Sequence, residues 1–319
     1  TSVDLADLEV KEEEKETTAS LIRGVLALLH KAGYPVAGFD MYVTSTVLPG
    51  SGLSSSAACE VLIGTTGNHL FCQDKFDAVE IAKIGQKAEN EYFGKPCGLM
   101  DQTASSVGDA VAIDFKDPAN PVVRAINADL AGLGLALCII DCGADHAALT
   151  NEYASIPEEM CKVAAHFGKK VLREVKEEEL LADLAQVRKE AGDRAVLRAL
   201  HFYADDRRAA EEADALERKD KEAFLNLVKE SGRSSWELLQ NITPAAAITH
   251  QDMAVALTVA EKALNGKGAC RVHGGGFAGT IQAFVPVEDV CEFKKTMETM
   301  LSEGCCHVLS IRPAGGLIL

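Results

Sequence analysis

Residues 47–58 carry the residue types best suited to hold a phosphate group. They read Val-Leu-Pro-Gly-Ser-Gly-Leu-Ser-Ser-Ser-Ala-Ala, so two close glycines and three serines lie between an extended segment and an apolar helix. A helix N-terminus offers unpaired backbone N–H groups and the positive end of its dipole to an anion. Gly50 and Gly52 would let that anion approach the backbone. No lysine follows the last glycine, so this is not a Walker loop, and a plain serine-capped turn also fits the pattern.

Two carboxylates flank a sharp turn in the next informative segment. Glu89 closes an expected helix, and Asp101 follows the run Gly94-Lys95-Pro96-Cys97-Gly98, which breaks it. A metal-bound phosphate donor needs at least one hard oxygen ligand, and a hydroxyl acceptor needs a carboxylate to orient it or to take its proton. The turn could bring both carboxylates to one cleft. Two solvated surface acids would look the same in the sequence.

The third segment, residues 273–279, reads His-Gly-Gly-Gly-Phe-Ala-Gly and formally satisfies G-x-G-x-x-G. An apolar strand is expected at 280–285, where a dinucleotide-binding motif would open a helix. The glycines therefore indicate a loop whose backbone passes close to a ligand or to another loop. A purely structural hairpin turn is the alternative.

The elements around these segments follow from hydrophobic periodicity and turn residues. The charged run 9–20 predicts a solvated helix start or a loop, and a change of texture near residue 143 predicts two domains, 1–142 and 143–319, each of α+β character. Helices are expected at 21–29, ended by Gly33, and at 55–71, 75–92, 252–264 and 287–301, with mostly helical chain from 143 to 240; strands are expected at 39–47, 110–115, 133–142, 280–285 and 307–312.

Composition narrows the class of protein. The 319 residues are 47% hydrophobic and 25% charged, which is typical of a globular protein with a sizeable core. No apolar run reaches the roughly 18 residues that span a bilayer. A net charge of −16 argues against nucleic acid and membrane partners. The ten cysteines form no C-x-x-C pair, which indicates reduced thiols and a cytoplasmic location.

Together the three segments resemble the sequence blocks of the GHMP kinase superfamily, and specifically its galactokinases. The glycine–serine turn is similar to the phosphate-binding block, Cys97-Gly98-Leu99-Met100-Asp101-Gln102 is similar to the galactokinase catalytic block, and residues 273–279 resemble the third block. Weaker similarity extends the resemblance over nearly the whole chain, at Gly33-Tyr34 with Gly38-Phe39-Asp40, at Asn151-Glu152-Tyr153 and at Ser231-Gly232-Arg233-Ser234.

The resemblance implies a two-domain α+β fold with the active site in the cleft between the domains. It implies transfer of the ATP γ-phosphoryl to the C1 hydroxyl of galactose, the first step of the Leloir pathway, with Mg²⁺ as cofactor. Asp101 would face that hydroxyl, Gly98 and Tyr153 would contact the sugar, and Ser55 and Glu89 would hold Mg²⁺. The residues implied to wrap the ATP phosphates are Gly50, Ser51, Gly52, Leu53, Ser54, Ser55 and Ser56.

The chain departs from the family pattern in places. The N-terminal galactokinase signature, a Gly-Arg start and a Glu/Asn-His-Thr-Asp run, is absent from these residues, so we expect the first domain to be incomplete at its N-terminus. Asp145-His146 stands where basic residues are usual, and His273 where threonine is frequent; for His273 a hydrogen-bonded structural role is the simpler expectation. Two alternatives stay open: another small-molecule GHMP kinase, and a non-catalytic sensor of galactose and ATP.

Overall fold

The structure is a computed structural model that describes residues 1–47, 54–143 and 149–319. The chain forms two compact units, Thr1–Asn127 together with Ile311–Leu319, and Ala128–Ser310. Both contain helices and strands, which agrees with the predicted α+β class. The predicted division at residue 142 falls inside the second unit, and the domain limits 1–142 and 143–319 stay a prediction.

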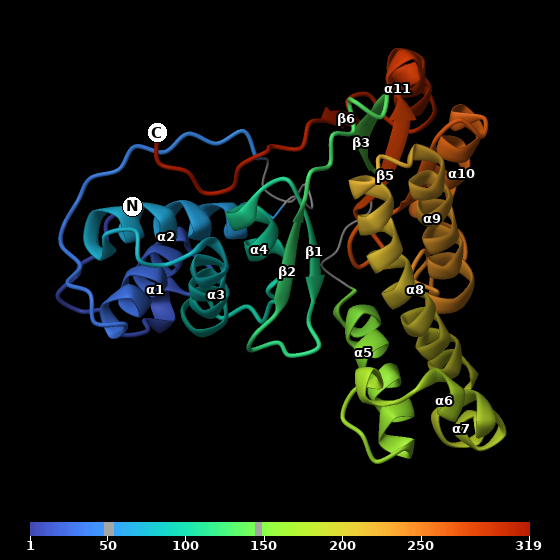
Figure 1. The fold of residues 1–319 in the computed structure, drawn as a ribbon, viewed down its shortest axis with the longest axis horizontal. Helices are drawn as coiled ribbons and strands as arrows, with labels where there is room; N and C mark the ends of the chain where they lie inside the picture. The colour runs from blue at the N-terminus through green and yellow to red at the C-terminus, as the bar shows by residue number, and fades with distance from the viewer. Residues whose placement is uncertain (48–53, 144–148) are drawn as a thin grey trace. The chain divides into compact units, whose positions relative to one another are not determined.

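The first unit is built around three packed helices, α1 (Thr18–Lys31), α2 (Ser55–Cys72) and α3 (Ala78–Ala88). Apolar residues of α1 and α2 form its core, with Val25, Leu29 and Ile63 almost fully buried. The helices pack closely because glycines stand at the contacts: a Cβ on Gly64 of α2 would lie 2.8 Å from Ile81 Cγ2 of α3. This packing fixes α2 against α3 (Figure 1).

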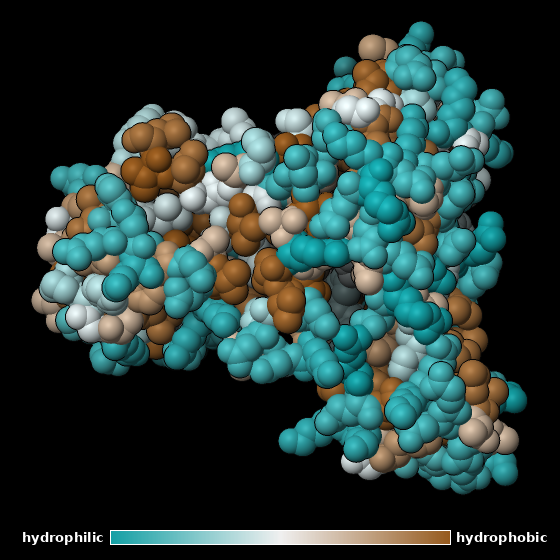
Figure 2. Space-filling view, viewed as in Figure 1, coloured by the Kyte–Doolittle hydropathy of each residue, from teal (hydrophilic) through white to brown (hydrophobic). Residues whose placement is uncertain are grey.

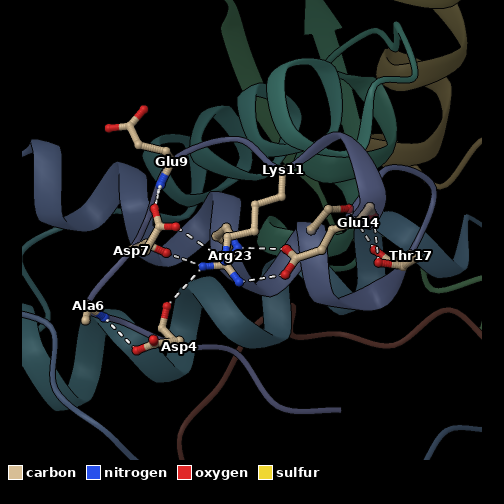
Figure 3. Close-up of polar contacts among 9 residues, drawn as sticks. Asp4, Ala6, Asp7, Glu9, Lys11, Glu14, Thr17 and Arg23 are labelled. Carbon is tan, nitrogen blue, oxygen red and sulfur yellow. Dashed lines mark hydrogen bonds and ion pairs between the residues drawn. The ribbon is translucent and has the colours of Figure 1, made fainter.

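A buried arginine ties the start of the chain to α1 (Figure 3). Arg23 is 2% exposed and binds both carboxylate oxygens of Glu14, at 2.7 Å from Nε and 2.6 Å from Nη2. Its Nη1 donates to the carbonyl oxygens of Asp4 and Asp7. The hydrogen bonds with Glu14 raise the pKa of Arg23. The charged run near the N-terminus is thus a loop with a short 3₁₀ turn (Glu12–Glu14). Most of its side chains are exposed, as predicted, but Glu14 is partly buried against Arg23.

Beyond α3, the first unit contains a π-helical turn (Glu89–Phe93), the short helix α4 (Met100–Val107) and the antiparallel pair β1 (Ala110–Asp114) and β2 (Val122–Ile126). The end of the chain returns to this unit: Asp109 N donates to Arg312 O at 2.7 Å, and Gly316 N donates to Ser106 O at 3.2 Å. Figure 2 shows an apolar patch at this end of the chain, where Leu317–Leu319 are exposed.

The predicted strand at 39–47 is wrong. Residues 34–46 are assigned to no helix or strand, and Tyr42 is 92% exposed. Alternating residue types make a strand possible, but a strand forms only where a neighbour satisfies its backbone N–H and C=O groups. Among the described residues no strand pairs with this segment. Phe39 nevertheless packs on Phe71 of α2, with ring centroids 5.7 Å apart.

The second unit contains a four-stranded antiparallel sheet of order β4-β5-β3-β6. The inner strand β5 is buried on both faces: Ile281, Ala283 and Val285 join the apolar core with helices α10 (Asp252–Leu264) and α11 (Val290–Met300), while Phe284 meets Phe224 of helix α9 (Lys221–Ser234) edge-on at 4.8 Å. The strands are β3 (Leu135–Asp141), β4 (Ala269–Val272), β5 (Thr280–Pro286) and β6 (Cys306–Leu309).

Helices form the rest of the second unit, as the texture beyond residue 143 predicted (Figure 1). Helices α5 to α8 enclose a separate apolar core that includes Val163, Leu180 and Val187. The helices are α5 (Thr150–His166), α6 (Glu177–Ala182), α7 (Leu184–Ala191), α8 (Asp193–Glu217), α9 (Lys221–Ser234), α10 (Asp252–Leu264) and α11 (Val290–Met300), with short 3₁₀ turns at Leu172–Glu174 and Val287–Asp289 and a π-helical turn at Ser235–Leu239. None of the described helices is long and apolar enough to cross a membrane.

Candidate active site

The predicted phosphate-binding block leads into the N-terminus of α2. Its residues 50–53 lie outside the described residues, so the description begins at Ser54. Ser54 adopts a left-handed conformation (φ 54°), and its side chain makes no capping hydrogen bond. The first intrahelical bond runs from Ala58 N to Ser54 O, so the amides of Ser55, Ser56 and Ala57 precede the helical hydrogen-bond ladder. Ser55 is exposed at this end. An anion at this helix start would meet N–H groups without intrahelical acceptors and the positive end of the dipole.

Glu89 is positioned by the end of α3. That helix starts at a capping box, in which Asp77 Oδ1 accepts from Glu80 N and Glu80 Oε2 accepts from Asp77 N, both at 2.8 Å. It ends where Glu89 opens the π-helical turn: the amides of Gly94 and Lys95 both bond to the Glu89 carbonyl, at 3.0 and 3.2 Å. The predicted helix 75–92 is therefore an α-helix followed by a wider turn. Single π-helical turns are frequent at functional sites because they change the register of side chains.

Glu89 is 2% exposed, and its carboxylate is held by a glutamine from α4. Gln102 Nε2 donates to Glu89 Oε2 at 2.8 Å and to Glu60 Oε2, from α2, at 3.0 Å. Glu60 is 0% and Gln102 1% exposed. A single amide thus joins two buried carboxyl groups that come from separate helices. Gly85 of α3 makes the approach possible, because a Cβ there would lie 3.1 Å from both Cβ and Oε2 of Glu60.

This burial changes the protonation chemistry of the cluster. Burial raises the pKa of Glu60 to about 8; the Gln102 hydrogen bond opposes the shift and the charge of Glu89 adds to it. Burial also raises the pKa of Cys97 to about 12, with a further contribution from a hydrogen bond to Glu89. The Cys97 thiol is therefore neutral and serves as a donor beside the carboxylate, not as a nucleophile.

Asp101 differs from Glu89 in being exposed. It occupies the first turn of α4, where the helix dipole favours a negative charge. The turn before α4 is fixed by Asn90, whose Oδ1 accepts from Cys97 N at 2.7 Å. Gly98 is exposed too, and a Cβ built on it would have no atom within 4 Å. Because Gln102 adjoins Asp101 in the chain and binds Glu89, the two predicted carboxylates come to the same part of the first unit.

Tyr153, the predicted sugar-contacting residue, belongs to the second unit. Its hydroxyl donates to Gly276 O at 2.9 Å, and its ring meets Phe277 edge-on at 5.6 Å. Burial raises its pKa. The glycines of residues 273–279 allow this contact: a Cβ on Gly275 would lie 2.9 Å from Tyr153 Cε1, and one on Gly276 (φ 83°) would lie 2.1 Å from Asn241 O.

The third block is the connection between the antiparallel strands β4 and β5, so the hairpin alternative is correct for its backbone. The close approach expected of its glycines is also present, toward Tyr153 and Asn241 as partners. His273 Nδ1 is 2.9 Å from Thr280 Oγ1, which confirms the expected hydrogen-bonded role. Asp145-His146 lies outside the described residues.

The sequence predicts Glu89 and Asp101 as site residues, but Glu60 is not among the predicted residues and Gln102 has no predicted role. A signal for Glu60 was available, because it is a lone acid within the otherwise apolar start of α2, Ala57-Ala58-Cys59-Glu60-Val61-Leu62-Ile63. An unpaired buried acid is costly, so such a residue implies a specific partner. No sequence feature names that partner, because the contact depends on how α2, α3 and α4 pack.

The donor set of the first unit fits Mg²⁺ bound together with phosphate oxygens. Glu89 offers a carboxylate and Ser55 a hydroxyl, which are hard oxygen donors. Within residues 1–47, 54–143 and 149–319, no three His, Cys, Asp or Glu side chains gather closely enough to hold a metal by themselves. Mg²⁺ in kinases is usually bound by one or two protein oxygens, substrate phosphates and water, so a protein cage is not needed.

Comparison with known proteins first defines the class. Residues 20–109, within the first unit, match the family described as the GHMP kinases N terminal domain. Two solved structures share the fold: the galactokinase of Lactococcus lactis complexed with galactose (TM-score 0.77, 24% identity, 99% of this chain and 80% of that one) and L. major mevalonate kinase in complex with R-mevalonate (TM-score 0.56, 12% identity, 95% and 78%).

Sequence relatives then define the family. The galactokinase of Streptomyces coelicolor is 33% identical over 275 residues, covering 86% of this chain and 68% of the relative. That of Actinobacillus pleuropneumoniae is 33% identical over 279 residues, covering 85% and 68%. The chain belongs to the galactokinase family of the GHMP kinases. The predicted resemblance and fold class are thereby confirmed.

Proposed function

We propose that this protein transfers the γ-phosphoryl group of ATP to the C1 hydroxyl of galactose, which yields galactose 1-phosphate and ADP. The observation that carries this proposal within a galactokinase-family chain is the pairing of two carboxylates with opposite environments. Glu89 is buried and hydrogen-bonded, which suits a fixed ligand, whereas Asp101 is exposed at a helix start, which suits contact with a substrate.

The proposed roles follow from these environments. The N-terminus of α2, with Ser54 to Ser56, binds phosphate oxygens through backbone amides, and the predicted residues 50–53 extend that cradle. Glu89 and Ser55 hold Mg²⁺, which supplies charge neutralisation for the transferred phosphoryl group. Asp101 orients the sugar hydroxyl or accepts its proton. Gly98 leaves space for the sugar, and Tyr153 is a further sugar-contacting residue.

We also propose that the protein acts on small molecules in the cytoplasm and binds no nucleic acid. All ten cysteines are free thiols, which suits a reducing compartment. The net charge of −16 opposes attraction to nucleic acid or to anionic lipid.

The test is phosphorus NMR of the protein with MgATP and galactose, in which a sugar 1-phosphate resonance should grow as ATP falls. Asp101→Ala should lower kcat by roughly 10²–10⁴-fold, the range for loss of a general base. Glu91→Ala removes an exposed acid from the neighbouring turn and is the matched control, with kcat expected to stay at the wild-type value.

Other results would redirect the proposal. Phosphorylation of a different sugar or alcohol, but not of galactose, would favour another GHMP kinase. An absence of transfer to any acceptor, with ATP and galactose binding intact in both wild type and Asp101→Ala, would favour a sensor. Equal turnover by Asp101→Ala and wild type would contradict the role of Asp101.

A further inference from the structure

The buried cluster of Glu60, Glu89 and Gln102 contains more polar groups than packing requires. Three helical elements meet there: α2 supplies Glu60, the π-helical turn supplies Glu89, and α4 supplies Gln102. All three side chains are at most 2% exposed. Apolar side chains of the same size would join these helices without burying any carboxyl group, and such replacements of buried polar clusters are often neutral or stabilising. The cluster therefore calls for a role beyond packing.

The hydrogen bonds of the cluster are incomplete in an informative way. Glu60 Oε1 and Gln102 Oε1 are buried and find no hydrogen-bond partner among the described residues. Buried polar atoms without partners are rare in native proteins and are concentrated where function demands them. The Gln102 amide nitrogen has partners: it approaches Glu60 Oε2, Glu89 Oε2 and, at 3.6 Å, Cys97 Sγ.

The geometry of the amide explains how this contact fixes Glu89. The two N–H groups of Gln102 Nε2 point to two carboxyl groups, at 3.0 Å for Glu60 and 2.8 Å for Glu89. Turning the amide over would direct its carbonyl oxygen at the Glu89 carboxylate and at Glu60 Oε2, the accepting oxygen of the Glu60 carboxyl, and would lose both hydrogen bonds. Glu60 therefore locks the orientation of Gln102, and Gln102 in turn binds one oxygen of Glu89. A carboxylate held at one oxygen presents the other in a defined direction, as supporting residues do for metal ligands.

The backbone at Glu89 supports the same purpose. Glu89 opens the π-helical turn, so its side chain leaves α3 in a register that a continued α-helix would not give. The Glu89 carbonyl accepts from two amides, Gly94 N and Lys95 N, which holds the turn in place. Backbone and side chain of this residue are thus both fixed.

We propose that Gln102, locked by Glu60, is the positioning residue that aims the Glu89 carboxylate at the nucleotide-bound cation. This inference rests on the proposed function, in which Glu89 is a cation ligand. Neither Glu60 nor Gln102 touches the substrate in this proposal; both act through Glu89. Loss of such a supporting residue typically weakens metal binding by about 10–100-fold.

The test measures cation binding directly, by electron paramagnetic resonance of Mn²⁺ with a non-hydrolysable ATP analogue and the intact protein. Gln102→Met and Glu60→Met remove the hydrogen bonds at similar volume and should weaken Mn²⁺ binding by about 10–100-fold. Glu60→Gln keeps an oxygen acceptor for Gln102 and should bind Mn²⁺ within about 3-fold of wild type. Affinity for the analogue without Mn²⁺ should stay unchanged in all three variants.

Thr65→Val is the matched control, because it also removes a buried polar atom without a partner from α2, but at a position with no contact to Glu89. Gln102→Asn, which shortens the amide, replaces Gln102→Met should that variant not fold, and carries the same expected loss. Wild-type Mn²⁺ affinity in folded Gln102→Asn or Gln102→Met would overturn this inference alone. A wild-type protein that binds the analogue but no Mn²⁺ would overturn the proposed function and this inference with it.

Discussion

The stability of the first unit should depend on pH through Glu60, and Glu60→Gln should remove that dependence. Burial raises the pKa of Glu60 from the ordinary glutamate value of 4.5 to about 8. Below pH 4.5 this carboxyl is protonated in both the folded and the unfolded chain, and its titration has no effect on stability. Between pH 4.5 and 8 the folded chain holds a proton that the unfolded chain has released. Stability therefore falls as pH rises through this window.

The magnitude follows from the width of the window. Each pH unit within it weakens folding by about 1.4 kcal/mol, so the full window is worth roughly 3–5 kcal/mol. Glutamine has the shape of protonated glutamate and does not titrate. We expect Glu60→Gln to match the wild type near pH 5 and to exceed it in stability by roughly 2–4 kcal/mol at pH 8.

The assay must report on the first unit alone, since a two-unit chain need not unfold in one step. The single tryptophan, Trp236, lies in the second unit and is unsuitable. Hydrogen exchange of α2 and α3 peptides, followed by mass spectrometry and corrected for intrinsic rates at each pH, gives the local opening free energy. Glu13→Gln, at an exposed acid, is the control and should show no pH-dependent gain. A difference between Glu60→Gln and wild type that stays constant from pH 5 to 8 would refute the reasoning.

Three further substitutions test the packing and the site. Gly98→Ala should leave the free energy of unfolding unchanged or raise it by about 0.4–1 kcal/mol. Its KM for galactose, measured by steady-state kinetics, should rise; an unchanged KM would contradict a place for Gly98 in the sugar site. Gly24→Ala should lose about 1–3 kcal/mol in urea unfolding, because its Cβ would lie 2.9 Å from Tyr92 Cγ, and wild-type stability would contradict that packing. Tyr153→Phe removes the hydrogen bond to Gly276 O and should lower the local opening free energy by about 0.5–1.5 kcal/mol, measured as faster amide exchange in residues 273–279.

Elements with local signals could be predicted from the sequence. The helix expected at 55–71 is Ser55–Cys72, and the one expected at 252–264 has those same limits. Helices are coded by periodicity and end residues within one segment, so neighbours are not needed to recognise them. Strands depend on partners. Residues 39–47 alternate between apolar and polar types but pair with no described strand, whereas residues 269–272 were not predicted as a strand and pair with β5.

The site residues differ in the same way: some have a local signal in the sequence, and others depend on partners from other elements. Glu89 and Asp101 could be proposed from the sequence because both carboxylates flank one Pro/Gly turn and Asp101 belongs to the block Cys97–Gln102. Gln102 stands in this block as well, yet its function is visible only through its partners, Glu60 from α2 and Glu89 from the π-helical turn. A contact among three separate elements has no local signature, and the sequence alone could reveal only that a lone acid was buried in an apolar helix.

The structure separates the glycines that the fold requires from those that it does not. In the third block, Gly275 and Gly276 are accounted for by the fold, because a Cβ at either position would collide with Tyr153 or Asn241. Gly98 has neither a positive φ nor a neighbour within 4 Å of a Cβ, so the protein itself gives no reason for glycine there. Gly38 has the same freedom but lies outside the catalytic block, which makes Gly38→Ala the control for Gly98→Ala: both should fold normally. Only the second should raise the KM, since a glycine that the fold does not require is best explained by space kept for a ligand.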